Sequence, residues 1–147
     1  MQFNFDVTLL PWIGKINKDF TFLVTQRLEQ KKLDLTAHQW LLLKKLNDLD
    51  GQPQYNLAFI THRDKTSLTR LVHIVERKGY VRRVPCTHDR RVNKVYLTAL
   101  GRDILQKALP VITTLVTQME NGVSKEEIFT AIEILKKVRC NLEKIAN

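Results

Sequence analysis

The chain has 147 residues, 44% of them hydrophobic, which is enough to bury a core and argues against a disordered tail. No apolar run approaches the roughly 20 residues that a membrane helix needs, and the N-terminus lacks the basic start of a secretory signal. The two cysteines are far apart without metal-type spacing, which favours a reduced, cytoplasmic protein. With no internal repeat or linker, we expect a single domain over 1–147, without metal or cofactor.

Two amphipathic helices are predicted in the first third of the chain. Apolar residues spaced by three and four indicate a helix from about Asp6 to Lys31. A second helix begins after Thr36, because Thr36 and Gln39 have the spacing of a capping box. Gly51 stops this second helix. Its expected apolar face consists of Leu42, Leu43, Leu46 and Leu49.

A pair of helices joined by a tight turn is predicted next. The first is short, from about Asn56 to Thr61, and the turn occupies 62–64. Asp64 can accept hydrogen bonds from the free amides of the following turn, so we expect it to cap a helix from Lys65 to Lys78. Gly79 supplies the left-handed residue that ends this helix. The spacing is that of a helix-turn-helix.

A hairpin and two long helices complete the chain. The segments 80–85 and 94–98 are rich in Val and Tyr and read as strands, with the polar loop 86–93 between them. A helix follows Thr98 to about Asn121, and Ser124 with Glu127 forms a second capping box before the last helix. We therefore predict a mainly α fold, a winged helix-turn-helix with a two-stranded wing hairpin.

The positive charge is concentrated in the centre of the chain. The net charge of +9 favours a polyanionic partner, either nucleic acid or an anionic membrane. The segment from Thr61 to Thr98 holds ten Lys and Arg residues and three acidic ones, so it carries +7 of that total. An ordinary solvated basic face is the alternative reading of this cluster.

Three stretches of the sequence resemble the MarR-type transcriptional regulators. They are "LTAHQWLLLKKL", "NLAFITHRDKTSLTRLVHIVERKGYVRR", and a wing signature made of Asp89, Arg91, Leu97, Thr98 and Gly101. The resemblance covers the whole chain in element order. It implies a dimeric DNA-binding regulator, expected to be a repressor, that recognises pseudo-palindromic double-stranded DNA. It also implies possible control by a small aromatic ligand, with 36–98 as the DNA-binding part and N- and C-terminal dimerisation helices in 1–33 and 99–147.

The helix from Lys65 to Lys78 has a polar stripe suited to the major groove. At 100° per residue its apolar residues fall on one side, and Thr66, Arg70, His73 and Arg77 fall on the other, flanked by Ser67 and Thr69. Arg70 is suited to a guanine edge, and the hydroxyl residues to phosphates or a thymine methyl group. A solvated helix face is the alternative.

The hairpin supplies a second set of candidate contacts. We expect Arg91 to enter the minor groove, with Asp89 holding an arginine to shape the tip, and the resemblance supports both roles. Arg90 is the better candidate for a phosphate contact. Further phosphate contacts are expected from Arg63, Arg82, Arg83 and Lys94. The terminal helices carry more apolar residues than one exposed surface tolerates, so we expect a two-fold homodimer.

Other functions receive less support from the sequence. No nucleophile, phosphate-loop or metal motif indicates an enzyme. A winged-helix module that binds protein instead of DNA is the alternative that stays open. Cys86 lies beside the basic hairpin and suggests a redox-sensor hypothesis. His38, Trp40, Trp12 and Phe20 are candidates for a ligand pocket or are ordinary core residues.

Overall fold

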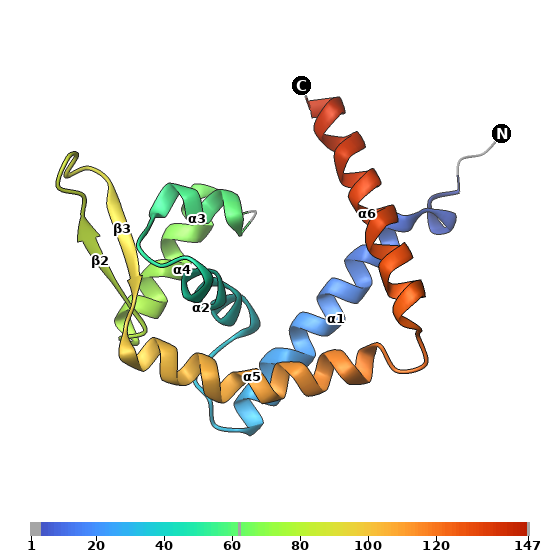
Figure 1. The fold of residues 1–147 in the computed structure, drawn as a ribbon, viewed down its shortest axis with the longest axis horizontal. Helices are drawn as coiled ribbons and strands as arrows, with labels where there is room; N and C mark the ends of the chain where they lie inside the picture. The colour runs from blue at the N-terminus through green and yellow to red at the C-terminus, as the bar shows by residue number, and fades with distance from the viewer. Residues whose placement is uncertain (1–3, 62, 147) are drawn as a thin grey trace. The chain divides into compact units, whose positions relative to one another are not determined.

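The computed structural model describes residues 4–61 and 63–146, so the predicted turn residue His62 lies outside the described part (Figure 1). The described elements are six α-helices, one short 3-10 helix and three strands. They are η1 (Phe5–Val7), α1 (Leu9–Gln30), α2 (Ala37–Asp48), β1 (Gln52–Pro53), α3 (Gln54–Ile60), α4 (Lys65–Arg77), β2 (Val81–Pro85), β3 (Asn93–Leu97), α5 (Ala99–Met119) and α6 (Lys125–Ala146). The mainly α, winged-helix prediction is confirmed. None of the described helices is long and apolar enough to cross a lipid bilayer.

The chain forms two compact units, 1–113 and 114–147, with the boundary inside α5. The single domain over 1–147, with a border between 98 and 99, stays a prediction. The first half of α5 belongs to the same compact unit as the winged part. Ile104, Leu105, Ala108 and Ile112 of α5 are buried together with residues of the earlier elements.

The first unit is built around one aliphatic core. Side chains from α1, α2, α3, α4 and the hairpin are at most 2% exposed, and they include Leu28, Leu42, Leu43, Leu46, Leu57, Leu68, Val72, Val75, Val81 and Val95. Leu49 was predicted to join this core and is instead 60% exposed. It is the C-cap of α2 in an extended conformation, so it has left the helical face on which Leu42 and Leu46 lie.

The strands form an antiparallel sheet in the order β1-β3-β2. The predicted hairpin pairs Val81 with Leu97 and Pro85 with Asn93. The sequence prediction missed β1, whose two residues pair with Val95 and Lys94 on the other edge of β3. Pro53 is tolerated there because β1 is an edge strand, where a missing N–H breaks no ladder. The central strand β3 is thus held from both sides.

The predicted helix caps are present. Thr36 and Gln39 form the capping box of α2, and Asp64 accepts a 2.8 Å hydrogen bond from the amide of Ser67 at the start of α4. Gly79 has a φ of +77°, which is the left-handed conformation expected after α4. These local signals fix where the helices of the winged part begin and end.

One junction joins α4, the hairpin and α5. The carbonyl oxygen of Tyr80 accepts hydrogen bonds from both the amide and the hydroxyl of Thr98, each 3.0 Å long. The Thr98 hydroxyl in turn accepts a hydrogen bond of 3.0 Å from the Gly101 amide. Asp50 joins the end of β3 to α5. One of its carboxylate oxygens accepts a hydrogen bond of 2.8 Å from the Leu97 amide, and the other binds Arg102 at 2.7 Å. The base of the hairpin is therefore fixed to the helices.

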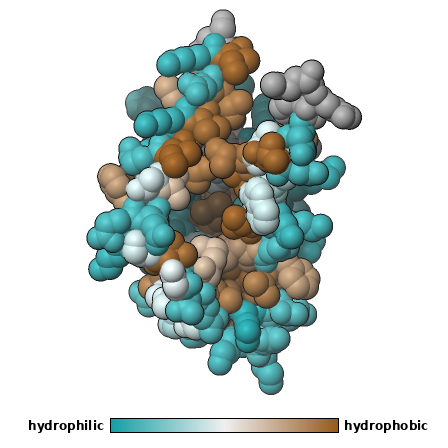
Figure 2. Space-filling view, turned by 90° about the vertical axis from the view of Figure 1, so that its right-hand side faces the viewer, coloured by the Kyte–Doolittle hydropathy of each residue, from teal (hydrophilic) through white to brown (hydrophobic). Residues whose placement is uncertain are grey.

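The second unit contains α6, which begins with the predicted capping box. The Ser124 amide donates to Glu127 at 2.7 Å, and the Glu127 amide donates to the Ser124 hydroxyl at 3.1 Å. No residue of α6 is buried, although the helix carries a regular series of apolar side chains. Exposed apolar side chains are visible on the face drawn in Figure 2.

Candidate nucleic-acid interface

The helix α4 presents one polar and basic face to solvent. Leu68, Leu71, Val72 and Val75 are buried on its inner side, as the sequence predicted. The outer side exposes Thr66, Thr69, Arg70, His73 and Arg77, and Ser67 is half-buried beside them. These side chains are exposed to solvent within the part of the chain that the structure describes, so a groove of suitable width has access to this face.

Hydrogen bonds order the small polar residues at the start of α4. Arg63 donates from Nη1 to the Ser67 hydroxyl at 2.8 Å. The Thr69 hydroxyl donates to the carbonyl of Lys65 at 2.8 Å and accepts from Nε2 of Gln54 at 3.0 Å. These contacts hold the hydroxyl groups in defined orientations, and they bring the half-buried Arg63 to the same end of the helix.

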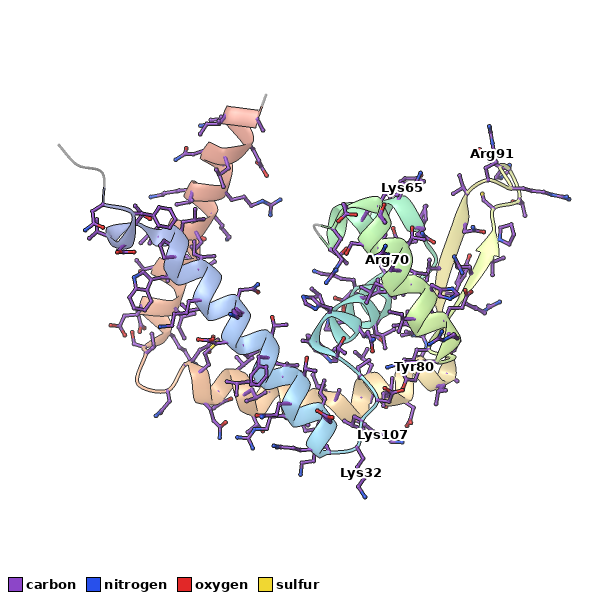
Figure 3. The ribbon with its side chains drawn as sticks, turned by 180° about the vertical axis from the view of Figure 1, so that it is seen from behind. Lys32, Lys65, Arg70, Tyr80, Arg91 and Lys107 are labelled. Carbon is purple, nitrogen blue, oxygen red and sulfur yellow. The ribbon has the colours of Figure 1, made fainter. Side chains whose placement is uncertain are left out.

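The hairpin tip is shaped by Asp89. Its Oδ1 accepts from the amide of Arg91 at 3.0 Å and from the guanidinium Nε at 3.2 Å, so a single oxygen holds both groups. The Cys86 amide donates to the carbonyl of Val92 at 2.7 Å and closes the loop. The side chain of Arg91 is 93% exposed and points away from the hairpin (Figure 3). Arg90 beside it is also exposed.

The basic residues of the hairpin strands have different surroundings. Arg82 is exposed, and its guanidinium carbon lies 5.2 Å from the centre of the Tyr96 ring. Arg83 points to the opposite face of the sheet, because neighbouring residues of a strand alternate. There it binds Glu76 of α4, with Nη2 and Oε2 2.6 Å apart. Lys94 is half-buried in β3. Of the three predicted phosphate contacts on the hairpin strands, Arg83 alone has a carboxylate partner among the ion pairs of the described residues.

A shallow hollow of about 200 Å³ lies where α3, α4 and the hairpin meet. Lys65 and Arg91 both line it, so the start of α4 and the hairpin tip border one surface (Figure 3). Gln54 and Tyr55 line it from α3, and Tyr55 is 64% exposed. The sequence interpretation left Gln54, Tyr55 and Lys65 out of the site. Lys65 was detectable as a cation in the first turn of the predicted helix, whereas the position of α3 depends on tertiary packing.

Two ionisable groups near this surface have shifted pKa values. Backbone amides of His88 and Asp89 that face the sulfur lower the pKa of the Cys86 thiol below its ordinary value of 9.0. Partial desolvation of its ring, together with the charge of Arg63, lowers the pKa of His38 and favours its neutral form. His38 lines a hollow of about 440 Å³ with Arg63 and Arg70.

The four candidate ligand residues have unlike environments. Trp12 is 60% exposed, which excludes it from the core of the described chain. Phe20 and Trp40 are half-buried, and His38 is exposed. The indole Nε1 of Trp40 is buried and has no acceptor among the described residues.

The helix-turn-helix of α3 and α4, followed by the hairpin, defines a winged helix-turn-helix protein. The family model described as "MarR family" matches residues 35–92, from the start of α2 to the hairpin tip. A MarR variant from E. coli complexed with operator DNA is 27% identical, with a TM-score of 0.83 over 94% of this chain and 98% of that one. The regulator BldR from Sulfolobus solfataricus is 28% identical, with a TM-score of 0.79 over 90% and 93% of the two chains.

A third structure extends the similarity in fold. AbsC, a MarR family transcriptional regulator from Streptomyces coelicolor, has a TM-score of 0.83 at 22% identity, over 98% of this chain and 99% of that chain. The motif, the family model and these structures agree. The chain is similar to the MarR family of transcriptional regulators, by the family model over residues 35–92 and in fold over nearly its whole length.

Proposed function

We propose that this protein is a homodimeric transcriptional regulator that recognises a pseudo-palindromic site in double-stranded DNA. The observation that carries the proposal is one surface that combines the exposed polar face of α4 with an exposed arginine at the hairpin tip. The E. coli MarR structure with operator DNA supports it, because that protein is similar over nearly the whole chain. Transcription regulation needs no catalysis, and no enzyme activity is proposed.

Each part of the surface has a specific task in the proposal. The outer face of α4 enters the major groove, where the exposed Arg70 is suited to donate two hydrogen bonds to a guanine. Arg91 enters the minor groove, and Asp89 keeps the tip in shape. The proposed phosphate and groove contacts are completed by Arg63, Thr66, Ser67, Thr69, His73, Arg77, Arg82, Arg90 and Lys94.

The proposal of a homodimer rests on uncovered apolar side chains in both terminal helices. In α1, Leu10, Trp12 and Ile16 are at least 55% exposed. In α6, Phe129, Leu142 and Ile145 are at least 59% exposed. Patches of this kind are covered in stable proteins, and a two-fold axis would place two α4 helices roughly 34 Å apart, about one turn of DNA. Analytical ultracentrifugation tests it, and a monomer at micromolar concentration would contradict it.

A small aromatic acid is the proposed class of effector. The hollow beside His38 brings Arg63 and Arg70 together, and these cations are suited to a carboxylate. A ligand bound there would compete with DNA for Arg70. Release of a bound duplex by benzoate or salicylate would support this control. Duplex affinity that is unchanged at millimolar concentrations of both acids would contradict it.

The main test is selection of bound sites from a random duplex library, followed by affinity measurements. We expect Arg91→Ala to weaken binding of the selected site by about 1–3 kcal/mol and leave the dimer intact. Lys107→Ala is the matched control, because Lys107 lies on α5 far from the hairpin tip (Figure 3) and should change affinity by less than about 0.5 kcal/mol. Wild-type affinity in Arg91→Ala would remove the minor-groove role. No binding of any duplex at low or moderate salt would favour the protein-interaction alternative.

A further inference from the structure

We propose that Glu76 is a positioning residue for DNA binding, which acts through Arg83 to hold the hairpin at a fixed angle to α4. The inference rests on the proposed function and assigns a task to two residues that need not touch DNA. In this proposal Arg83 positions the hairpin, and the phosphate contact expected for it from the sequence is not made. The angle matters because α4 and the hairpin tip have to enter neighbouring grooves of the same duplex.

The contact between the two residues has three parts. Oε1 of Glu76 accepts a 2.8 Å hydrogen bond from the backbone amide of Arg83. Oε2 accepts a 2.8 Å hydrogen bond from Nε of the same residue and lies 2.6 Å from Nη2. The carboxylate therefore binds both the main chain and the guanidinium of one strand residue. Such a forked contact restricts orientation more strongly than a single ion pair does.

The position of the pair connects two elements that both belong to the proposed interface. Glu76 lies in the last turn of α4, and Arg83 is the central residue of β2, opposite Val95 of β3. Val95 is fully buried, so this face of the sheet is packed onto the body of the unit. The side chains of Glu76 and Arg83 are 31% and 28% exposed, which places the pair at the edge of that packing.

A small rotation at this position would be amplified at the hairpin tip. Five residues, Val84 to His88, lie between Arg83 and Asp89 at the tip, and the last three of them belong to the loop. At no more than roughly 3.3 Å per residue, the pair and the tip are roughly 15 Å apart. A tilt of roughly 10° would therefore move the tip by roughly 2.6 Å, which is about the length of a hydrogen bond. Arg91 would then miss contacts that it makes when the hairpin is held.

The electrostatic arrangement is consistent with this task. The hydrogen bond from Arg83 is the main reason that the pKa of Glu76 is lowered, so the carboxylate is ionised at neutral pH. The two opposite charges compensate each other. Arg83 is then a poor phosphate ligand, because it would have to leave Glu76 uncompensated beside the negatively charged DNA.

A double-mutant cycle with Glu76→Gln, Arg83→Gln and the double variant tests the proposal. Fluorescence anisotropy measures the affinity of each variant for a selected site and for a random duplex. The measurements run between about 50 and 200 mM salt, because the effect of counterion release on affinity is measurable in this range. We expect Glu76→Gln to weaken binding of the selected site about three- to tenfold, although it removes a negative charge. The double variant should bind the selected site no more weakly than either single variant does. Binding to random duplex should change little.

The salt dependence separates the two roles of Arg83. If Arg83 positions the hairpin, Arg83→Gln and Arg83→Lys should both weaken the selected site and leave the salt slope unchanged. The matched control is Arg82→Gln on the exposed face, which should reduce the slope by about 0.9. A slope that falls in Arg83→Gln, wild-type affinity in Arg83→Lys, or tighter binding by Glu76→Gln would overturn the proposal.

A measurement without DNA separates failure of this inference from failure of the proposed function. The Arg83 amide donates to Glu76, so its hydrogen exchange should be slow in the wild type and fast in Glu76→Ala, which removes the acceptor, with Val95 unaffected. Fast exchange of the Arg83 amide in the wild type would show that its hydrogen bond to Glu76 is not formed, and the proposal would be wrong. If that amide is protected but the wild type binds no duplex, the proposed function fails and the positioning role fails with it, while the contact itself stands.

Discussion

Replacement of Gly101 by alanine should break the junction on which the hairpin depends. Gly101 is buried in the first turn of α5. A Cβ atom at this position would lie 2.0 Å from the carbonyl oxygen of Tyr80 and 2.9 Å from Cδ1 of Leu97. Because an ordinary contact begins at 3.4 Å, the two backbones would have to separate by about 1.4 Å. That shift exceeds what a flexible side chain could absorb, since the first obstacle is main chain.

The expected change in the free energy of unfolding for Gly101→Ala is the sum of opposing contributions. Alanine gains about 0.5–1 kcal/mol over glycine within a helix. Overpacking costs about 1–3 kcal/mol and occasionally more. The displaced carbonyl of Tyr80 also loses its two hydrogen bonds from Thr98, each contributing about 1 kcal/mol. The free energy of unfolding should therefore fall by about 2–4 kcal/mol for Gly101→Ala.

Urea denaturation at fixed protein concentration measures this change, because a dimer's apparent stability depends on concentration. Gly14→Ala is the matched control. Gly14 also lies in a helix, but a Cβ there would meet nothing within 4 Å, so this variant should be neutral or more stable by up to about 1 kcal/mol. If Gly101→Ala is as stable as Gly14→Ala, the argument from the close approach at Tyr80 is wrong.

Three further predictions concern the caps and ionisable groups. Asp64→Ala should lower the free energy of unfolding by about 1 kcal/mol because α4 loses its N-cap, and Asp64→Asn should retain most of it in urea denaturation. Arg83 lowers the pKa of Glu76, so the contact between the two residues stabilises the folded state. This contribution is present above the ordinary pKa of 4.5 for Glu76 and is lost as the pH falls through the lowered value. Glu76→Gln should therefore lose less stability than the wild type between pH 6 and acidic pH, and equal losses would refute the pairing. In a Cys140→Ser background, alkylation of Cys86 by iodoacetamide should reach half its maximal rate below pH 9.0, and a midpoint at or above that pH would contradict the lowered pKa.

Local chemistry in the sequence was sufficient to predict most of the winged part. Thr36 with Gln39, Asp64 and Gly79 act over one helical turn, so their roles follow from neighbours in the chain. The same holds for the tip, where Asp89 binds Arg91 two residues away. The family signature also contained Gly101, but its physical reason became clear only from the approach of Tyr80.

Features that depend on the packing of distant elements were not predictable in the same way. The strand β1 has two residues, one of them proline, and so it shows no alternation of apolar side chains. Leu49 continues the apolar spacing of α2 but lies just beyond its last turn. The partner of Arg83 depends on the angle between α4 and the hairpin, which no sequence spacing contains. The positive charge of Arg83 was the basis for predicting a phosphate contact.

The central position of β3 has a consequence for changes in the length of the hairpin. Because β3 is flanked by β1 and β2, its register does not depend on the tip, which the Cys86–Val92 hydrogen bond closes separately. Insertions or deletions within that loop should therefore be tolerated as readily as those in any exposed connection. The hairpin tip can therefore become longer or shorter, by natural variation or by design, without a change in the rest of the winged part. Such a change would alter which DNA sequences the tip favours.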